Sequence, residues 1–159
     1  EPNDLQHVVS EPNSDRTKTL AFYGDAFLGY HCTCFLKECS TDVGVGVLSV
    51  ARSSMVSNAV LASISTYFTD LSVTSTYALS DHSKGTIFEA LIELSENANG
   101  TDFVVNRLSK FFNILFRFSK DLIARSDVLQ QPLYYEKKLA LWLQHYKKVA
   151  SEVREEKQM

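Results

Sequence analysis

The sequence of 159 residues contains few cysteines, and their placement argues against a disulfide-stapled scaffold. Cys32, Cys34 and Cys39 fall within eight residues, so none has a distant partner with which it could form a crosslink. We therefore expect a reduced, intracellular protein with no disulfide partner. These cysteines and His31 also lack the spacing around a turn that structural zinc sites use, which argues against a zinc centre.

Long hydrophobic runs and an excess of positive charge are missing as well. No apolar run reaches transmembrane length, so we expect no membrane partner. Sixteen Lys and Arg residues against nineteen Asp and Glu residues give a net charge of −3, which is not typical of a general nucleic-acid binder. Any affinity for RNA must then come from local patches or bound cations. Because the chain begins without Met, we expect that an N-terminal segment such as a targeting peptide has been removed.

What the sequence does contain is 45% hydrophobic residues, largely at helical spacing, which predicts a single all-α domain. The expected helices run from a cap at Asp15 or Thr17 to about Glu38, and over about 47–68, 84–97 and 102–125. The third of these is expected to end at the Asn99-Gly100 turn. Residues 69–82 are expected to be irregular or to hold a short strand.

The two ends of the chain are predicted to lie outside this domain. Residues 1–16 contain two Glu-Pro-Asn sequences and little periodicity, so they are expected to form an extended or mobile arm. Pro132 interrupts the chain, and a last helix over about 133–155 is expected to dock on the domain. The predicted organisation is an N-terminal arm, a domain over 17–127 and a C-terminal helical segment over 128–159.

The stretch from Thr19 to Phe35 holds one acid, Asp25, among seventeen otherwise uncharged residues. A carboxylate buried among large apolar side chains is unfavourable unless it is paired, so Asp25 is expected either to cap a backbone or to hold a cation. Gly24, directly before it, predicts a close approach of a partner helix or a ligand to the backbone. Glu89 lies in a similarly hydrophobic segment, where it could hold a cation or pair with Arg52 or Lys84.

Three segments resemble, in order, motifs of the ribonuclease III family. LAFYGDAFL (Leu20–Leu28) is similar to the family's signature helix, and MVSNAVLA (Met55–Ala62) is similar to its L-V-S-N segment. GTIFEALIEL (Gly85–Leu94) is similar to its F-E-A-L-I helix. With the connecting helices, the resemblance covers about residues 15–127. It implies a ribonuclease III endonuclease-domain fold and a homodimer.

The resemblance also implies roles for individual residues. Asp25 and Glu89 match the family's two central catalytic metal ligands, which implies a Mg²⁺ site in which Mn²⁺ can substitute. Phe22 matches the aromatic residue that inserts into the partner subunit at the dimer interface. Asn58 and Thr86 are expected to orient metal-bound water as a second shell.

Two positions depart from the usual four-acid site, because Ala21 and Thr86 stand where the family has acids. This is the pattern of the non-catalytic ribonuclease III domains of organellar ribosomes and RNA-editing complexes. It is equally the pattern of the Mini-RNase III branch, which shares the L-A-x-x-G-D-A sequence, the Thr before F-E-A-L-I, the similar length and the lack of an RNA-binding domain. The chain differs from that branch in keeping the Val56-Ser57-Asn58 sequence and in carrying Glu93 where glycine is usual.

The helix expected over 102–125 has basic residues on the side opposite its apolar residues. Those proposed to bind RNA are Arg107, Lys110 and Arg117. The basic side is either a solvated face or a stripe that tracks phosphates.

We therefore expect a Mg²⁺-dependent endoribonuclease that cleaves double-stranded RNA in precursor RNA processing. Such a domain recognises the A-form helix by its shape, backbone and 2′-hydroxyls, and the resemblance implies 5′-phosphate and 3′-hydroxyl products. A mitochondrial location is compatible, because versions of this domain occur in kinetoplastid mitochondria. The alternative is a catalytically inactive domain with a structural or heterodimerisation role in a ribosomal or RNA-editing complex. A plain helical protein-interaction module is a third class.

Overall fold

The computed structural model describes residues 2–39, 44–68, 79–124 and 141. Within these ranges the elements are α1 (Pro2–Ser10), α2 (Asp15–Cys39), α3 (Val45–Met55), α4 (Asn58–Phe68), α5 (Asp81–Asn99) and α6 (Thr101–Ala124). The described part of the chain contains no strand, and the prediction of an all-α fold is confirmed. The helix predicted over 133–155 lies outside the described residues.

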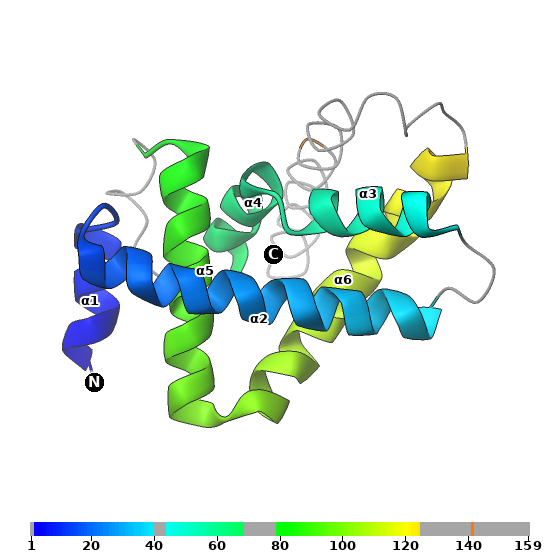
Figure 1. Cartoon of the computed structure of the whole chain (residues 1–159). Coiled ribbons are helices and arrows are strands. Elements are labelled where there is room, and N and C mark those ends of the chain that lie inside the picture. Colours follow the sequence, from blue (N-terminus) through cyan, green and yellow to red (C-terminus); the bar gives the residue numbers. More distant parts are fainter. Residues whose placement is uncertain (1, 40–43, 69–78, 125–140, 142–159) are drawn as a thin grey trace, which may run out of the picture.

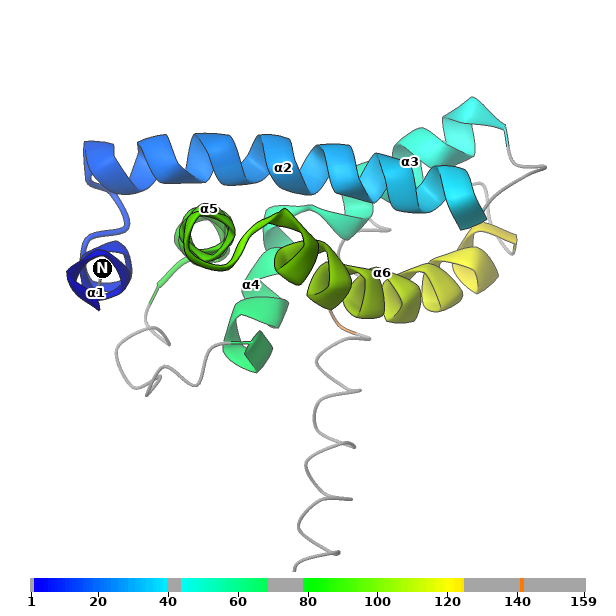
Figure 2. The ribbon, with the colours of Figure 1, turned by 90° about the horizontal axis from the view of Figure 1, so that it is seen from below.

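Helix α2 lies across α5, and this crossing organises the domain (Figure 1). Seen from below, α2 runs along one side, with α5, α4 and α6 beneath it and α1 at one end (Figure 2). Gly24 makes the crossing possible, because a Cβ atom built there would lie 1.8 Å from the backbone carbonyl oxygen of Glu89. The close approach predicted at Gly24 is therefore that of a partner helix, α5.

The main hydrophobic core lies between α2, α3, α4, α5 and α6. Helix α2 contributes Leu28, Cys32 and Leu36, which recur every four residues and so share one face. Helix α6 has the predicted apolar face, and its buried members are Val104, Leu108, Phe111, Phe112 and Leu115. The amphipathic pattern of the sequence thus decided which sides of these two helices face inward.

The expectation of an extended N-terminal arm is wrong for residues 2–10, which form α1. Pro2 stands at the first helical position, where proline is favoured because its missing N–H would have no helical partner anyway. Val8 is fully buried in a small cluster with Ala21, Ile87 and Ala90. Burial of one apolar face therefore fixes α1 against the domain.

The second Glu-Pro-Asn sequence forms the turn between α1 and α2, which a hydrogen-bonded network holds. Ser14 caps α2, since its hydroxyl oxygen accepts a hydrogen bond from the backbone N–H of Thr17 at 3.2 Å. The cap is therefore one residue before the predicted Asp15. Thr17 is fully buried, and its hydroxyl donates to the carbonyl oxygen of Glu11 at 2.9 Å. An ion pair between Arg16 and Asp4 joins the two helices.

The helix predicted over 47–68 is two helices, α3 and α4, separated at Val56 and Ser57. Ser57 starts α4, because its hydroxyl oxygen accepts from the backbone N–H of Val60 at 3.4 Å. In the described ranges no single helix is long and apolar enough to cross a membrane. Helix α3 and the start of α4 reach that length and apolar character only when taken together, and the two are bent by 46° relative to each other. The break turns Asn58 toward α5.

Helix α5 begins three residues before its predicted start, because Ser80 caps it. The Ser80 hydroxyl accepts from the backbone N–H of Ser83 at 3.2 Å. The helix ends at Gly100, whose φ of 87° is in the left-handed region that favours glycine, as the predicted turn requires. Asp81 and His82 therefore belong to α5 and not to the irregular segment, of which residues 69–78 lie outside the described residues.

Candidate functional site

A cleft of about 480 Å³ lies beside the crossing of α2 and α5. It is lined by Asp25 and Phe22 from α2, by Asn58 from the start of α4, and by Thr86 and Glu89 from α5. These five residues come from three segments that are far apart in the sequence. All the residues proposed from the sequence for the metal site and its surroundings thus share one cleft.

Helical spacing explains how α2 and α5 present these residues together. On α5, Thr86 and Glu89 are three residues apart and lie on the same face. On α2, Phe22 and Asp25 are also three residues apart, next to Gly24 at the crossing. The crossing therefore brings the Asp25 and Glu89 carboxylates to the same end of the cleft.

Asp25 is exposed, so the expectation that its carboxylate is buried is wrong. It lies in the middle of α2 and so cannot cap the end of that helix, which excludes the capping alternative. Leu28, Cys32 and Leu36 take the core-facing side of α2, whereas Asp25 and Phe22 both line the cleft. A carboxylate at this position is therefore available to a ligand in the cleft.

Glu89 is half-buried, and its environment disfavours the charged form. Burial, and to a smaller extent the negative charge of Asp25, together raise the pKa of Glu89 from 4.5 to about 7. Within the described residues Glu89 forms no ion pair, and Arg52 instead donates to the hydroxyl of Thr33 at 3.3 Å. The pairing alternatives with Arg52 and Lys84 are therefore not realised.

The side chain of Asn58 binds a residue that the sequence analysis missed. Its amide Nδ2 lies 3.2 Å from Nδ1 of His82, which also lines the cleft. Gly85 allows this contact, because a Cβ atom there would meet Oδ1 of Asn58 at 2.4 Å. The predicted role of Asn58 in orienting water thus competes with its bond to His82.

Thr86 is partly exposed in the cleft, and its hydroxyl donates to the carbonyl oxygen of His82 at 3.0 Å. The lone pairs of its oxygen are free to accept a hydrogen bond or to face a cation. Thr86 is therefore placed for the second-shell role that the sequence predicts.

The donor set fits a hydrated hard cation better than a closed metal cage. In the described ranges no group of three or more His, Cys, Asp or Glu side chains is arranged to hold a metal ion. Two carboxylates are present, and Mg²⁺ commonly keeps several waters while one or two carboxylates bind it. The raised pKa of Glu89 also indicates negative charge that a cation would compensate.

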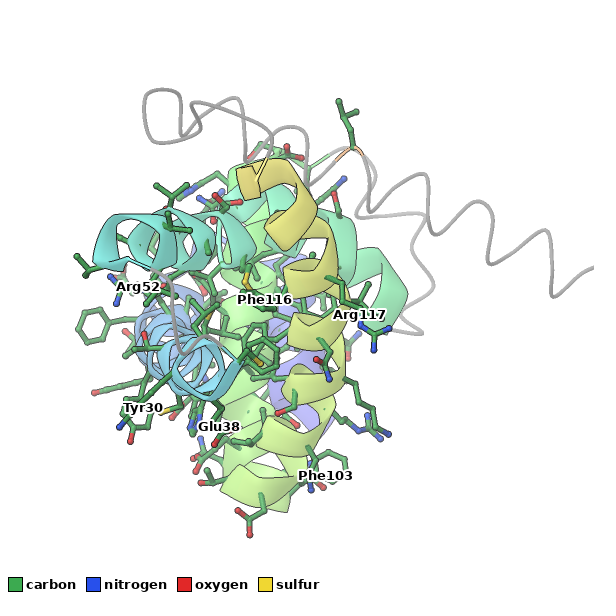
Figure 3. The ribbon with its side chains drawn as sticks, turned by 90° about the vertical axis from the view of Figure 1, so that its right-hand side faces the viewer. Tyr30, Glu38, Arg52, Phe103, Phe116 and Arg117 are labelled. Atoms are coloured by element: carbon green, nitrogen blue, oxygen red, sulfur yellow. The ribbon has the colours of Figure 1, made fainter. Side chains whose placement is uncertain are left out.

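Phe22 is 72% exposed, which excludes the alternative that it belongs to the core of its own chain. Tyr23 beside it is 54% exposed, and the two ring centroids are 5.7 Å apart in an edge-to-face arrangement. Tyr30, further along the same helix, is 66% exposed and projects outward (Figure 3). An exposed aromatic group of this kind is typical of a surface that a partner covers.

The three basic residues proposed to bind RNA are exposed on α6 and do not line the cleft. Arg107 packs its guanidinium 4.4 Å from the ring centroid of Phe103. Arg117 points away from the bundle on the outer side of α6 (Figure 3). These residues therefore form a surface separate from the carboxylates.

In the part of the chain that the structure describes, none of the three cysteines forms a disulfide. Burial raises the pKa of the Cys32 thiol to about 12, so this side chain is a core residue and not a nucleophile.

The cleft thus combines two carboxylates, a hydroxyl, an amide and an imidazole beside an exposed aromatic residue. Oxygen ligands of this type suit hydrolysis of a phosphodiester with a divalent cation. Comparison of the chain with family models, with curated proteins and with solved structures finds no match in any of the three.

Proposed function

We propose that this chain is a Mg²⁺-dependent endonuclease domain of the ribonuclease III type that cleaves double-stranded RNA as a homodimer. One observation carries the proposal: the cleft unites Asp25, Asn58, Thr86 and Glu89, which three separate motifs had suggested independently. The sequence spacing of these motifs does not require them to meet. Their meeting supports both the family resemblance and a shared chemical role.

Asp25 and Glu89 would hold the cation, with Thr86 directing a water beside it. The cation would supply an activated water and neutralise charge on the phosphate. The chain's own contribution is to hold two carboxylates at the crossing of α2 and α5, where the rigid contact of Gly24 with the Glu89 backbone prevents them from separating. Partial burial of Glu89 also keeps its carboxylate from being fully hydrated before a ligand arrives.

Phe22 links the cleft to the proposed dimer. It lines the cleft and is also largely exposed, so a partner that covers it must lie beside the carboxylates. A second copy of the chain in that place would bring a second cleft close to the first. Two clefts suit a substrate with two strands, such as an RNA precursor folded into a duplex. We propose that this cleavage of precursor RNA takes place in the mitochondrion.

A catalytically inactive scaffold is the second candidate, and the surroundings of Ala21 favour it. Ala21 is only 5% exposed and packs in the cluster of Val8, Ile87 and Ala90. Ala21 also lines the cleft, so at its position a methyl group stands beside the apolar cluster where the family has a carboxylate. The domain would then retain the shape of the site and serve a ribosomal or RNA-editing assembly.

Incubation of the purified protein with a long RNA duplex decides between the two. Cleavage in Mg²⁺ and in Mn²⁺, but not in EDTA, is expected, with 5′-phosphate and 3′-hydroxyl ends. Single-stranded RNA of the same sequence serves as the control substrate, and Glu89→Gln serves as the control protein. Intact duplex in both metals, with a verified homodimer, would select the scaffold.

A further inference from the structure

Two hydrogen-bond donors line the same cleft at a distance from the carboxylates. Lys18 stands seven residues before Asp25 on α2, and His82 stands seven residues before Glu89 on α5. Seven residues are close to two helical turns, so each donor shares a face with its carboxylate about 10 Å away along the axis. Helices α2 and α5 cross where Gly24 meets the Glu89 backbone, and their N-terminal parts diverge from this crossing (Figure 1). Lys18 and His82 belong to these two N-terminal parts, and both line the cleft.

The ring of His82 lines the cleft and is held by the side chain of Asn58. An amide nitrogen only donates hydrogen bonds, so Nδ2 of Asn58 donates to Nδ1 of His82 at 3.2 Å. The proton of the neutral ring then resides on Nε2. The contact of Asn58 with Gly85 leaves the amide little room to move. His82 therefore offers an N–H group to a ligand in the cleft.

Lys18 supplies the charged donor on the other arm. It is exposed, and within the described residues it has no acidic partner. The turn that precedes it, with Pro12 and Asn13, completes the same wall of the cleft. An ammonium and an imidazole N–H are both groups that bind the anionic oxygens of phosphates.

We propose that Lys18 and His82 bind the phosphodiester groups that flank the one positioned at Asp25 and Glu89. This inference rests on the proposed function, in which the ligand is a strand of duplex RNA. It explains how a chain of net charge −3 can retain a polyanion at a pair of carboxylates. The two donors then fix the register of the strand, because they hold it on both sides of the cleavage position.

Binding of an end-labelled RNA duplex, measured by fluorescence anisotropy in EDTA over a range of salt concentrations, tests the two contacts without hydrolysis. Lys18→Gln is expected to weaken binding about tenfold and to reduce the slope of log K against log salt by about one, because a cation is removed. His82→Phe is expected to weaken binding by a similar factor, because a hydrogen-bond donor to a phosphate oxygen is removed. Lys37→Gln is the matched control, since Lys37 is an exposed lysine of the same helix outside the cleft.

Each outcome separates this inference from the proposed function. Lys18→Gln and His82→Phe proteins that bind like Lys37→Gln overturn the phosphate contacts, even if the wild type cleaves RNA. A wild type that binds but never cleaves, with both variants weakened, supports the contacts and overturns the enzyme. A wild type that binds no duplex in EDTA but cleaves it in Mg²⁺ overturns the contacts alone, and one that neither binds nor cleaves overturns both. A variant that loses its melting transition is replaced by Lys18→Met or His82→Gln, for which loss of affinity is again expected.

Discussion

Replacing Glu89 with glutamine is expected to stabilise the metal-free protein and at the same time to abolish RNA cleavage. Burial and, as the smaller cause, the negative charge of Asp25 together raise the pKa of Glu89 to about 7. At higher pH the folded protein therefore holds a carboxylate that its surroundings disfavour. Glutamine has nearly the same shape and no charge, so it removes this penalty together with the proposed metal ligand.

The sign of the pH dependence follows from the direction of the shift. Between pH 4.5 and about 7 the folded state binds more protons at Glu89 than the unfolded state, so stability falls as the pH rises through this window. The destabilisation by the charged Glu89 carboxylate is absent below pH 4.5 and complete above about pH 7. With allowance for the partial exposure of Glu89, its size is roughly 1–3 kcal/mol. Asp25→Asn removes only the smaller, repulsive cause and is expected to stabilise by under about 1 kcal/mol.

Urea denaturation without divalent cations at about pH 5 and pH 8 measures the effect. The free energy of unfolding of the wild type is expected to be lower at the higher pH by roughly 1–3 kcal/mol. That of Glu89→Gln is expected to lack this decrease. Glu38→Gln, which changes an exposed glutamate on α2, is the matched control and should follow the wild type. Mg²⁺ at the higher pH should raise the melting temperature of the wild type by mass action, but not that of Glu89→Gln.

Two results would refute this reasoning in different ways. The same loss of stability with pH in Glu89→Gln and in the wild type would mean that the Glu89 carboxylate is not the disfavoured charge. A stabilised Glu89→Gln protein that still cleaves duplex RNA at the wild-type rate would remove Glu89 from the catalytic site. Cleavage that falls by orders of magnitude in a stabilised protein is the expected combination.

Five further substitutions test other parts of the structure. Phe22→Ala is expected to change the stability of the single chain by under about 0.5 kcal/mol, because the ring is 72% exposed, yet to shift the dimer toward monomer in sedimentation; an unchanged dimer at low concentration contradicts this. Gly24→Ala should lower the free energy of unfolding, measured in urea, by about 3 kcal/mol, because its Cβ meets a backbone carbonyl of α5 at 1.8 Å. The Cβ of Gly29→Ala meets nothing within 4 Å, so this variant should be more stable than the wild type by up to about 1 kcal/mol. Arg117→Glu should weaken duplex binding and lower the salt slope; a wild-type slope would identify a solvated face. Thr86→Asp should increase the melting-temperature rise caused by Mg²⁺, and an equal or smaller rise would argue against a cation beside it.

The sequence was informative wherever local chemistry decides the outcome. The apolar spacing over 102–125 predicts a helix with one buried face, and α6 has it. The Asn99-Gly100 pair predicts a helix end, because only glycine adopts the positive φ found there without strain. Gly24 likewise predicts a close backbone contact. These features depend on the residue itself and its near neighbours.

The sequence was misleading where a distant partner decides. Residues 2–10 have little periodicity, yet α1 forms because Val8 is buried against Ala21, Ile87 and Ala90. The helix over 47–68 divides at Ser57, whose hydroxyl caps α4 in competition with continued helix. Asp25 was expected to be buried, since apolar residues surround it in sequence, but Leu28, Cys32 and Leu36 occupy the inward face of α2 and leave Asp25 exposed.

The sequence by itself indicated the all-helical class, the inward face of α6 and the acids that carry the proposed chemistry, because helical spacing is a local property. Only the tertiary structure decided that Asp25, Asn58 and Glu89 share one cleft, since that depends on where α2, α4 and α5 meet. It also decided that His82 lies on α5. The seven-residue spacing of His82 and Glu89 is meaningful only because the cap at Ser80 starts the helix before His82. Which groups a side chain meets across the cleft is a consequence of packing, and packing is the sum of many contacts that no single stretch of sequence contains.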